Sequence, residues 1–283
     1  MSSQAGASEY IAHHMINFSV PQGLQPGIFN FSYVNIDTLV VATALGVIVS
    51  LVLWFLARRF TSGVPGRAQA AVELLYEFVD DSCKSMIHNP NSRKVLAPLG
   101  LAVLVWIFFL NAMDLLPVDL LPWGWQKVLA NPDAHLRVVP TADLNTAMAL
   151  ALSVFALVIY YSIKIKGLRG WVHELFAVPF GNKIWFAFPN LLMNLIEYVS
   201  KTLSHGMRLW GNMYAGEIVF MVIALLGGAW GKSGSVAADA VLFIVQVVLG
   251  SAWAIFHILI IGLQAYLFMI LTFVYLGQAH ESH

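Results

Sequence analysis

Charge is scarce in this chain of 283 residues, of which only 11% are Asp, Glu, Lys or Arg and 59% are hydrophobic. Soluble domains carry about 25% charged residues, so the composition excludes an ordinary soluble protein. The 15 basic residues balance the 15 acidic ones. This lack of net charge argues against nucleic acid as a partner.

Cysteine is almost absent, and the motifs of common site types are incomplete. Cys83 alone excludes an internal disulfide and gives no metal-binding pattern, so we expect no metal and no cofactor. His173-Glu174 begins like a zinc-protease motif but lacks the second histidine, and Gly231-Lys-Ser233 lacks the first glycine of a phosphate-binding loop. The N-terminal residues lack the basic start and apolar core of a signal peptide, so we expect the first span to remain in the mature protein.

What the chain does have is long stretches without charge. Residues 38–57, 95–113 and 144–163 contain no charged side chain. Each stretch matches the roughly 20 residues that a helix needs to cross a hydrocarbon core of about 30 Å. Because backbone groups in lipid must pair within their own segment, we predict three transmembrane helices rather than buried helices of a soluble protein.

Two further apolar segments, about 190–228 and 238–277, are longer. As single helices they would measure roughly 60 Å, about twice the hydrocarbon thickness. Each therefore either folds back on itself or crosses at a steep tilt. We predict two long, tilted helices that form a hairpin.

The rest of the chain completes an all-α polytopic membrane protein with five transmembrane helices. Apolar residues recur at helical spacing from 69 to 86, with charged residues between them, which predicts an amphipathic helix at the membrane surface; a contact with a partner is the alternative. We expect residues 1–37 to form an extracytoplasmic segment and residues 38–283 a single transmembrane domain.

Loop charges predict the orientation. Residues 58–94 hold six Lys or Arg and residues 164–183 hold four, whereas the N-terminal tail holds none and residues 114–143 hold two. The positive-inside rule places the N-terminus outside, both basic loops inside, and the C-terminus in the cytoplasm.

Charged residues inside a membrane are costly and usually functional. Arg208 and Glu217 both lie within the fourth apolar segment, nine residues apart and hence on nearly opposite helix faces. One helix face collects five polar residues at spacings of three or four, and such a face cannot contact lipid: Glu197, Lys201, Ser204, Arg208 and Asn212. In the last segment Trp253, His257 and Gln264 share a face, where His257 either conducts protons or is a buried neutral imidazole bonded to a backbone carbonyl.

The segment Arg208-Leu-Trp-Gly-Asn-Met-Tyr-Ala-Gly-Glu217 closely resembles the signature of subunit a of bacterial F-type rotary ATP synthases. Four other segments resemble that family in the same order: Thr61-Ser-Gly-Val-Pro-Gly66, Asn111-Ala-Met-Asp114-Leu-Leu-Pro-Val-Asp119, Val138-Val-Pro-Thr-Ala-Asp143 and Ala252-Trp-Ala-Ile-Phe-His257-Ile-Leu-Ile-Ile-Gly-Leu-Gln264.

The resemblance implies a non-catalytic, proton-translocating stator subunit of the bacterial inner membrane. Its implied partners are a ring of c subunits, peripheral-stalk b subunits, the rest of the ATP synthase and membrane lipids. Arg208 would favour the ionised ring carboxylate and block a leak between two half-channels. The implied outer path holds Glu217 and His257, with Asn212 and Gln264 beside the arginine. Three acids would lie near the outer mouth: Asp114, Asp119 and Asp143.

The chain departs from the family pattern near the inner path. Asn194 occupies the position, fourteen before the arginine, where many bacterial members carry an acid, and Glu197 is the acid nearby. His205 and Trp210 also replace commoner residues; His205 either tunes the arginine's surroundings or packs, and we favour packing. A proton-coupled secondary transporter is the main rival class, but we find none of the repeated halves typical of such transporters.

Overall fold

The structure of the protein is a computed structural model. It describes residues 19–20, 34–116, 124–125, 127, 138–181, 183–227 and 235–280, and the structural statements below refer to these residues.

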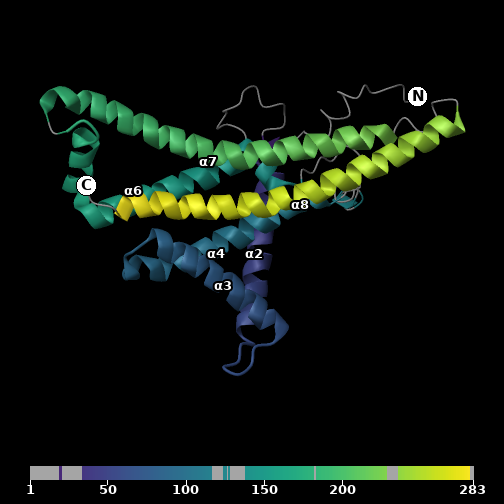
Figure 1. The fold of residues 1–283 in the computed structure, drawn as a ribbon, viewed down its shortest axis with the longest axis horizontal. Coiled ribbons are helices and arrows are strands. Elements are labelled where there is room, and N and C mark those ends of the chain that lie inside the picture. The colour runs from purple at the N-terminus through teal and green to yellow at the C-terminus, as the bar shows by residue number, and fades with distance from the viewer. Residues whose placement is uncertain are drawn as a thin grey trace. The chain divides into compact units, whose positions relative to one another are not determined.

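The described part of the chain is built from helices (Figure 1). The elements in chain order are β1 (Ser19–Val20), β2 (Val34–Asn35), α2 (Ile36–Ala57), α3 (Arg67–Met86), α4 (Pro90–Ala112), η1 (Met113–Leu115), η2 (Pro140–Ala142), α6 (Leu144–Ala177), α7 (Ile184–Gly227) and α8 (Val236–His280). By length and composition, 5 helices are apolar enough to cross a membrane: α2, α4 with η1, α6, α7 and α8. The prediction of an all-α polytopic membrane protein is confirmed, with α3 as the additional helix.

Local capping explains why the second span begins at Pro90, earlier than expected. The side-chain oxygen of Asn89 accepts the backbone N–H of Asn91 at 3.0 Å. Asparagine before a helix and proline at its first position are favourable, because both suit backbone groups that have no intrahelical partner.

Where we expected a loop after residue 163, α6 continues to Ala177. It does so with a break at Gly167, whose φ of 72° and ψ of 161° lie outside the helical region. Glycine suits a positive φ because it has no Cβ, so this residue ends one helical stretch and lets the chain begin another.

The two longest helices are each continuous, with 44 residues in α7 and 45 in α8. The alternative that each segment folds back on itself is therefore wrong. The steep tilt and the hairpin remain predictions, because the structure contains no membrane and residues 228–234 between the helices lie outside the described part.

The chain divides into two compact units, which we describe separately. Unit 1 comprises Met1–Ile48, Phe108–Thr146 and Trp210–Leu263, and unit 2 comprises Val49–Ile107, Ala147–Leu209 and Gln264–His283. The single transmembrane domain of the sequence analysis remains a prediction.

In unit 1, η2 packs against the two long helices. Val139 and Ala142 form a buried cluster with Met213 of α7, and Ile260 of α8 packs against it. The backbone between residues 139 and 143 is thereby held against both helices.

In unit 2, glycines allow close contacts with α8. A Cβ on Gly100 of α4 would lie 2.1 Å from Cζ of Phe273, and one on Gly277 would lie 2.7 Å from the backbone oxygen of Met86. Cys83 is fully buried in this unit. Burial, together with the nearby charge of Asp80, raises the pKa of its thiol from 9.0 to about 11, which makes it a poor nucleophile.

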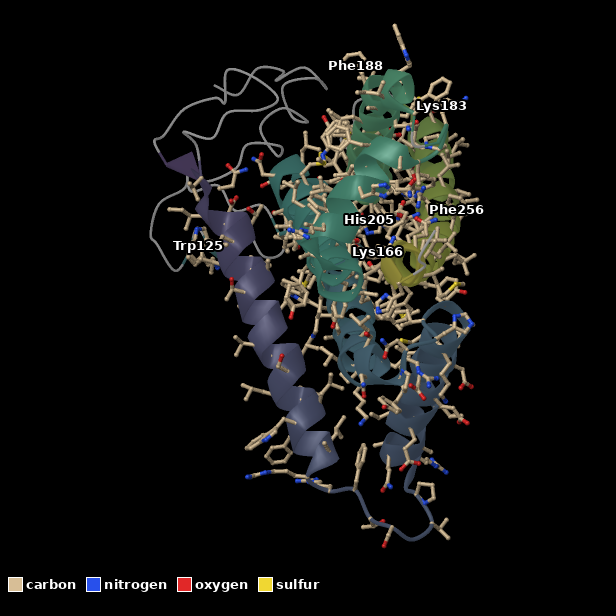
Figure 2. The ribbon with its side chains drawn as sticks, turned by 90° about the vertical axis from the view of Figure 1, so that its left-hand side faces the viewer. Trp125, Lys166, Lys183, Phe188, His205 and Phe256 are labelled. Carbon is tan, nitrogen blue, oxygen red and sulfur yellow. The ribbon has the colours of Figure 1, made fainter. Side chains whose placement is uncertain are left out.

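The outer surface of the helices is rich in large apolar side chains. Phe188 of α7 is 73% exposed and Phe256 of α8 is 52% exposed (Figure 2). Extended apolar surface of this kind requires lipid or a protein partner to cover it.

Candidate functional site

The buried polar centre of unit 1 is formed by Asp114 and His257. Nε2 of His257 lies 2.6 Å from Oδ2 of Asp114, and the side chains are 0% exposed for His257 and 5% for Asp114. The distance is that of an ion pair, although the atoms do not have the alignment of a directed hydrogen bond. His257 thus faces a carboxylate rather than a backbone carbonyl, and the two groups can hold a proton between them.

Close packing holds the imidazole in this position. A Cβ on Gly216 would lie 2.2 Å from Cε1 of His257, so α7 can approach the ring only because residue 216 is glycine. The next residue, Glu217, is buried with 6% exposure. Phe220 contacts the His257 ring edge-on at a centroid distance of 5.3 Å, and Trp253 stacks on it at 6.2 Å.

Several buried polar atoms of unit 1 have no hydrogen-bond partner among the described residues. Besides the facing atoms of Asp114 and His257, they are both amide atoms of Asn111, Oγ1 of Thr141, Oε1 of Gln246, Nε1 of Trp253 and Nδ1 of His257. Buried polar atoms in proteins nearly always pair with protein or ordered water. This concentration of unpaired atoms on one unit therefore indicates a hydrated polar interior.

Asp143 has a well-defined structural role in unit 1. Its carboxylate accepts hydrogen bonds from Nδ2 of Asn35 at 2.7 Å, from Oγ1 of Thr38 at 3.2 Å and from the backbone N–H of Asn145 at 3.0 Å. The last of these caps the N-terminus of α6. Asp143 therefore ties α6 to the start of α2, and its predicted place at an outer mouth remains a prediction.

Arg208 lies in unit 2, on α7. Its side chain is half-buried, and among the described residues it makes no ion pair and no hydrogen bond. Gln264 of α8, in the same unit, is buried with 7% exposure. An arginine in an apolar helix without a counter-charge is unfavourable, so its partner must be provided from elsewhere.

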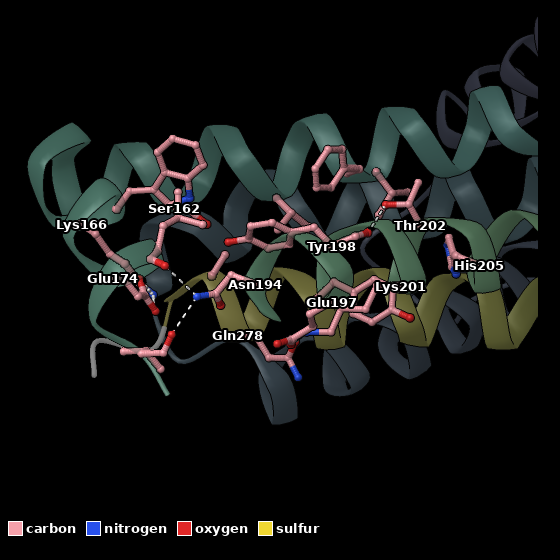
Figure 3. A pocket seen from close by; sticks show the side chains of 18 of the residues that line it. Ser162, Lys166, Glu174, Asn194, Glu197, Tyr198, Lys201, Thr202, His205 and Gln278 are labelled. Carbon is pink, nitrogen blue, oxygen red and sulfur yellow. Dashed lines mark hydrogen bonds and ion pairs between the residues drawn. The ribbon is translucent and has the colours of Figure 1, made fainter. Parts of the chain in front are cut away.

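Unit 2 also contains a cavity of about 260 Å³ between α6, α7 and α8. Its polar or charged lining residues are Ser162, Lys166, Trp171, Glu174, Asn194, Glu197, Tyr198, Lys201, Thr202, His205, Tyr275 and Gln278. Figure 3 shows Lys166 and Glu174 at one end of the cavity and His205 at the other.

Both carboxylates of the cavity are paired with lysines. Nζ of Lys166 lies 2.7 Å from Oε2 of Glu174, and Nζ of Lys201 lies 2.5 Å from Oε1 of Glu197. Lys201 also donates to Oε1 of Gln278 at 2.8 Å. Glu197, the acid that we expected to serve the inner path, is therefore held by a neighbour on its own helix.

Asn194 serves a structural purpose in this unit. Its Nδ2 lies 2.8 Å from the backbone oxygen of Val178 and 3.0 Å from that of Leu175 (Figure 3). Asn190, one turn earlier, binds the same segment by donating to the backbone oxygen of Phe176 at 2.8 Å. A carboxylate at position 194 would repel these carbonyl oxygens, which explains why an amide stands there.

The described contacts thus bring Asp114 to His257. Glu217 is buried on α7, directly after the glycine that contacts His257. Asn212 is half-buried in unit 1, and Asp119 lies outside the described residues. Sequence reasoning assigned no role to Gly216, Asn111 or Lys166. Asn111 had a visible signal, since it is a polar residue near the end of a charge-free run. No group of three or more His, Cys, Asp or Glu in the described residues is arranged to hold a metal.

Comparisons with known proteins agree with these observations. The profile of the family described as ATP synthase A chain matches residues 39–277. The chain is 56% identical to ATP synthase subunit a of Acidovorax sp. (strain JS42), over 98% of this chain and 97% of that protein. It is also 55% identical to ATP synthase subunit a of Paracidovorax citrulli (strain AAC00-1), with the same coverage, and 45% identical to ATP synthase subunit a 1 of Photobacterium profundum, over 98% of this chain and 96% of that protein.

Proposed function

Because the chain belongs to the family of ATP synthase subunit a, we propose that it is a stator subunit in which two half-channels carry protons past Arg208. Family membership places it in the membrane sector of ATP synthase, as a multi-pass protein of the proton channel that works together with other ATP synthase subunits. The observation that carries the finer proposal is the half-buried Arg208, which has no counter-charge among the described residues.

The missing counter-charge is supplied by a carboxylate of a rotating c-subunit ring. A guanidinium stays charged at every physiological pH, so Arg208 favours the ionised state of each carboxylate that passes it. The carboxylate releases its proton to one half-channel and receives the next proton from the other. The fixed positive charge prevents a proton from passing directly between the two.

Unit 1 provides the outer half-channel. The unpaired polar atoms of Asn111 and Thr141 hold water, and a proton from this water is taken up between Asp114 and His257. Glu217, buried on the neighbouring helix, passes the proton toward the ring. Groups that exchange protons over hydrogen-bond distances suit this relay.

The cavity of unit 2 provides the inner half-channel. The loop charges favour a cytoplasmic position for residues 164–183, and this segment supplies Lys166 and Glu174 to the cavity. The protein then lies in the bacterial inner membrane with its N-terminus outside and its C-terminus in the cytoplasm. Peripheral-stalk b subunits and lipids cover the remaining apolar surface, and catalysis belongs to other subunits of the complex.

Substitution of Arg208 tests this function in membrane vesicles. Arg208→Ala should abolish ATP synthesis and ATP-driven pumping while passive proton flow through the membrane sector stays equal or rises. Arg208→Lys should also fail, because an ammonium cannot reproduce the planar fork of the guanidinium. Blotting for the assembled complex shows whether the arginine only holds helices together. An assembled Arg208→Ala complex that synthesises ATP at the normal rate would show that the proposal is wrong.

A further inference from the structure

His205 lines the unit 2 cavity at the end opposite Lys166 and Glu174 (Figure 3). It lies three residues before Arg208 in the sequence. Packing accounts for the faces of its ring: the Phe268 ring lies 3.9 Å away between centroids, and the Tyr275 ring lies 5.7 Å away. These contacts agree with the packing role that we expected for His205. Packing against aromatic rings does not satisfy the ring nitrogens.

Nε2 of His205 is buried and has no hydrogen-bond partner among the described residues, and the whole side chain is only 2% exposed. An unpaired nitrogen at this depth requires a ligand. The cavity that His205 lines has a volume of about 260 Å³. One water molecule occupies about 30 Å³ in the liquid, so the cavity has room for several waters beside the ring.

Among the groups that line the cavity, His205 provides the imidazole, and the charged side chains near it are cations or are already paired. From α7 it is faced by Lys201 and, one turn further on, by Arg208; from α8 it is faced by Tyr275. Of the two carboxylates that line the cavity, Glu174 is paired with Lys166 and Glu197 with Lys201. Asn194 cannot titrate.

We propose that His205 is a proton-relay residue of the inner half-channel, binding cavity water through Nε2 and passing protons between that water and the surroundings of Arg208. Residues three apart on a helix are neighbours on its surface, so the relay lies beside the arginine. Nδ1 accepts the proton that a c-subunit carboxylate releases beside Arg208, while Nε2 gives its proton to cavity water. The imidazole keeps its charge, and rotation of the side chain restores the starting tautomer before the next transfer. This inference rests on the proposed function and adds the residue that compensates for the missing acid at position 194.

Three substitutions separate a relay from a packing role. His205→Gln keeps hydrogen-bonding groups but cannot titrate, His205→Leu keeps only bulk, and His205→Glu restores a titratable group. We expect His205→Gln and His205→Leu to lower passive proton flow and ATP-driven pumping by about tenfold or more. Both should flatten the dependence on cytoplasmic pH, and His205→Glu should restore part of the flow with a shifted pH profile. An assembled His205→Gln complex with the normal rate and pH profile would overturn the proposal.

Thiol labelling tests the water without changing His205. Thr202 lines the cavity, whereas the adjacent Leu203 does not and is 41% exposed on the apolar surface. We expect a charged thiol reagent to modify the Thr202→Cys variant and to spare the Leu203→Cys variant, because thiolates form in water and not in hydrocarbon. The native thiol of Cys83 is fully buried and adds no background. Absence of reaction in the Thr202→Cys variant would mean a dry cavity and would refute the relay even if the His205 variants fail to assemble.

The outcome is separable from that of the proposed function. If Arg208→Ala is inactive while His205→Gln behaves normally, the half-channel function stands and only the relay is refuted. If Arg208→Ala still performs coupled transport, the function itself is wrong.

Discussion

The polar groups buried in the two units differ in how they are paired. In unit 1, Asp114 and His257 form a buried ion pair, and several nearby buried polar atoms have no hydrogen-bond partner among the described residues. In unit 2, both carboxylates of the cavity are held by lysines, and the unpaired lining nitrogens among the described residues are Nε2 of His205 and Nε1 of Trp171. On the proposed function, the residues that carry protons are therefore selected by their packing and their access to water, and not by the number of charged residues nearby.

The two units also differ in how closely side chains pack around their polar groups. The ring of His257 is enclosed by Gly216, Phe220 and Trp253, so the proton transfer that we propose for unit 1 depends on side chains held in place. Unit 2 instead contains a cavity of about 260 Å³, in which, on the proposed function, water conducts the proton over most of the path. Substitutions should therefore act through geometry in unit 1 and through hydration and charge in unit 2.

After Arg208, the largest effect is expected from Glu217 and His257 of unit 1. Glu217→Ala or His257→Ala should each reduce ATP-driven pumping by about 100-fold, because a positioned proton-transfer group contributes roughly 10² or more. Pumping is measured in inverted vesicles after blotting for assembly. The exchange Glu217→His with His257→Glu should perform better than either loss, since both titratable groups are present. Normal pumping in both Ala variants would reduce the two residues to packing.

The next effect concerns the close approach of α7 to His257. Gly216→Ala places a Cβ 2.2 Å from Cε1 of His257, so the ring or the helix must shift, which disturbs the 2.6 Å contact with Asp114. Such overpacking costs about 1–3 kcal/mol, and we expect about a tenfold loss of pumping. Gly250→Ala is the matched control, because its Cβ meets Ile223 at an ordinary 3.7 Å. Equal activity in the two variants would contradict the role given to packing in unit 1.

Much of this architecture was predictable because the charge-free runs are long and unambiguous. Arg208 and Glu217 also stood out, as ionisable residues within such a run. The partnership of Asp114 with His257 was not predictable, since it joins residues distant in sequence through the packing of three helices. Asn194 appeared as a mere departure from the family pattern, because its hydrogen bonds to Leu175 at the end of α6 and to Val178 just after it exist only in the folded chain. Nothing marked Gly216, since membrane helices tolerate isolated glycines.

The smallest effect is expected from the ion pair at the cavity of unit 2. The Lys166 side chain is 10% exposed and the Glu174 side chain 26% exposed, so Glu174→Gln leaves a poorly solvated ammonium. We expect a loss of about 1–3 kcal/mol, seen as a lower thermal midpoint of the purified complex. Lys84→Met removes a more exposed cation from its pairs with Asp80 and Asp81 and should change the midpoint little. A larger shift in the control would show that burial does not distinguish these pairs.

The central claim is that the two polar regions are reached by water from opposite sides of the membrane. Thr141 in unit 1 and Thr202 in unit 2 provide positions for one thiol each, in a Cys83→Ser background. A membrane-impermeant reagent is applied to right-side-out and to inverted vesicles. We expect the Thr141→Cys variant to react from outside and the Thr202→Cys variant from the cytoplasmic side. Reaction of both variants from the same side, or of neither, would contradict it.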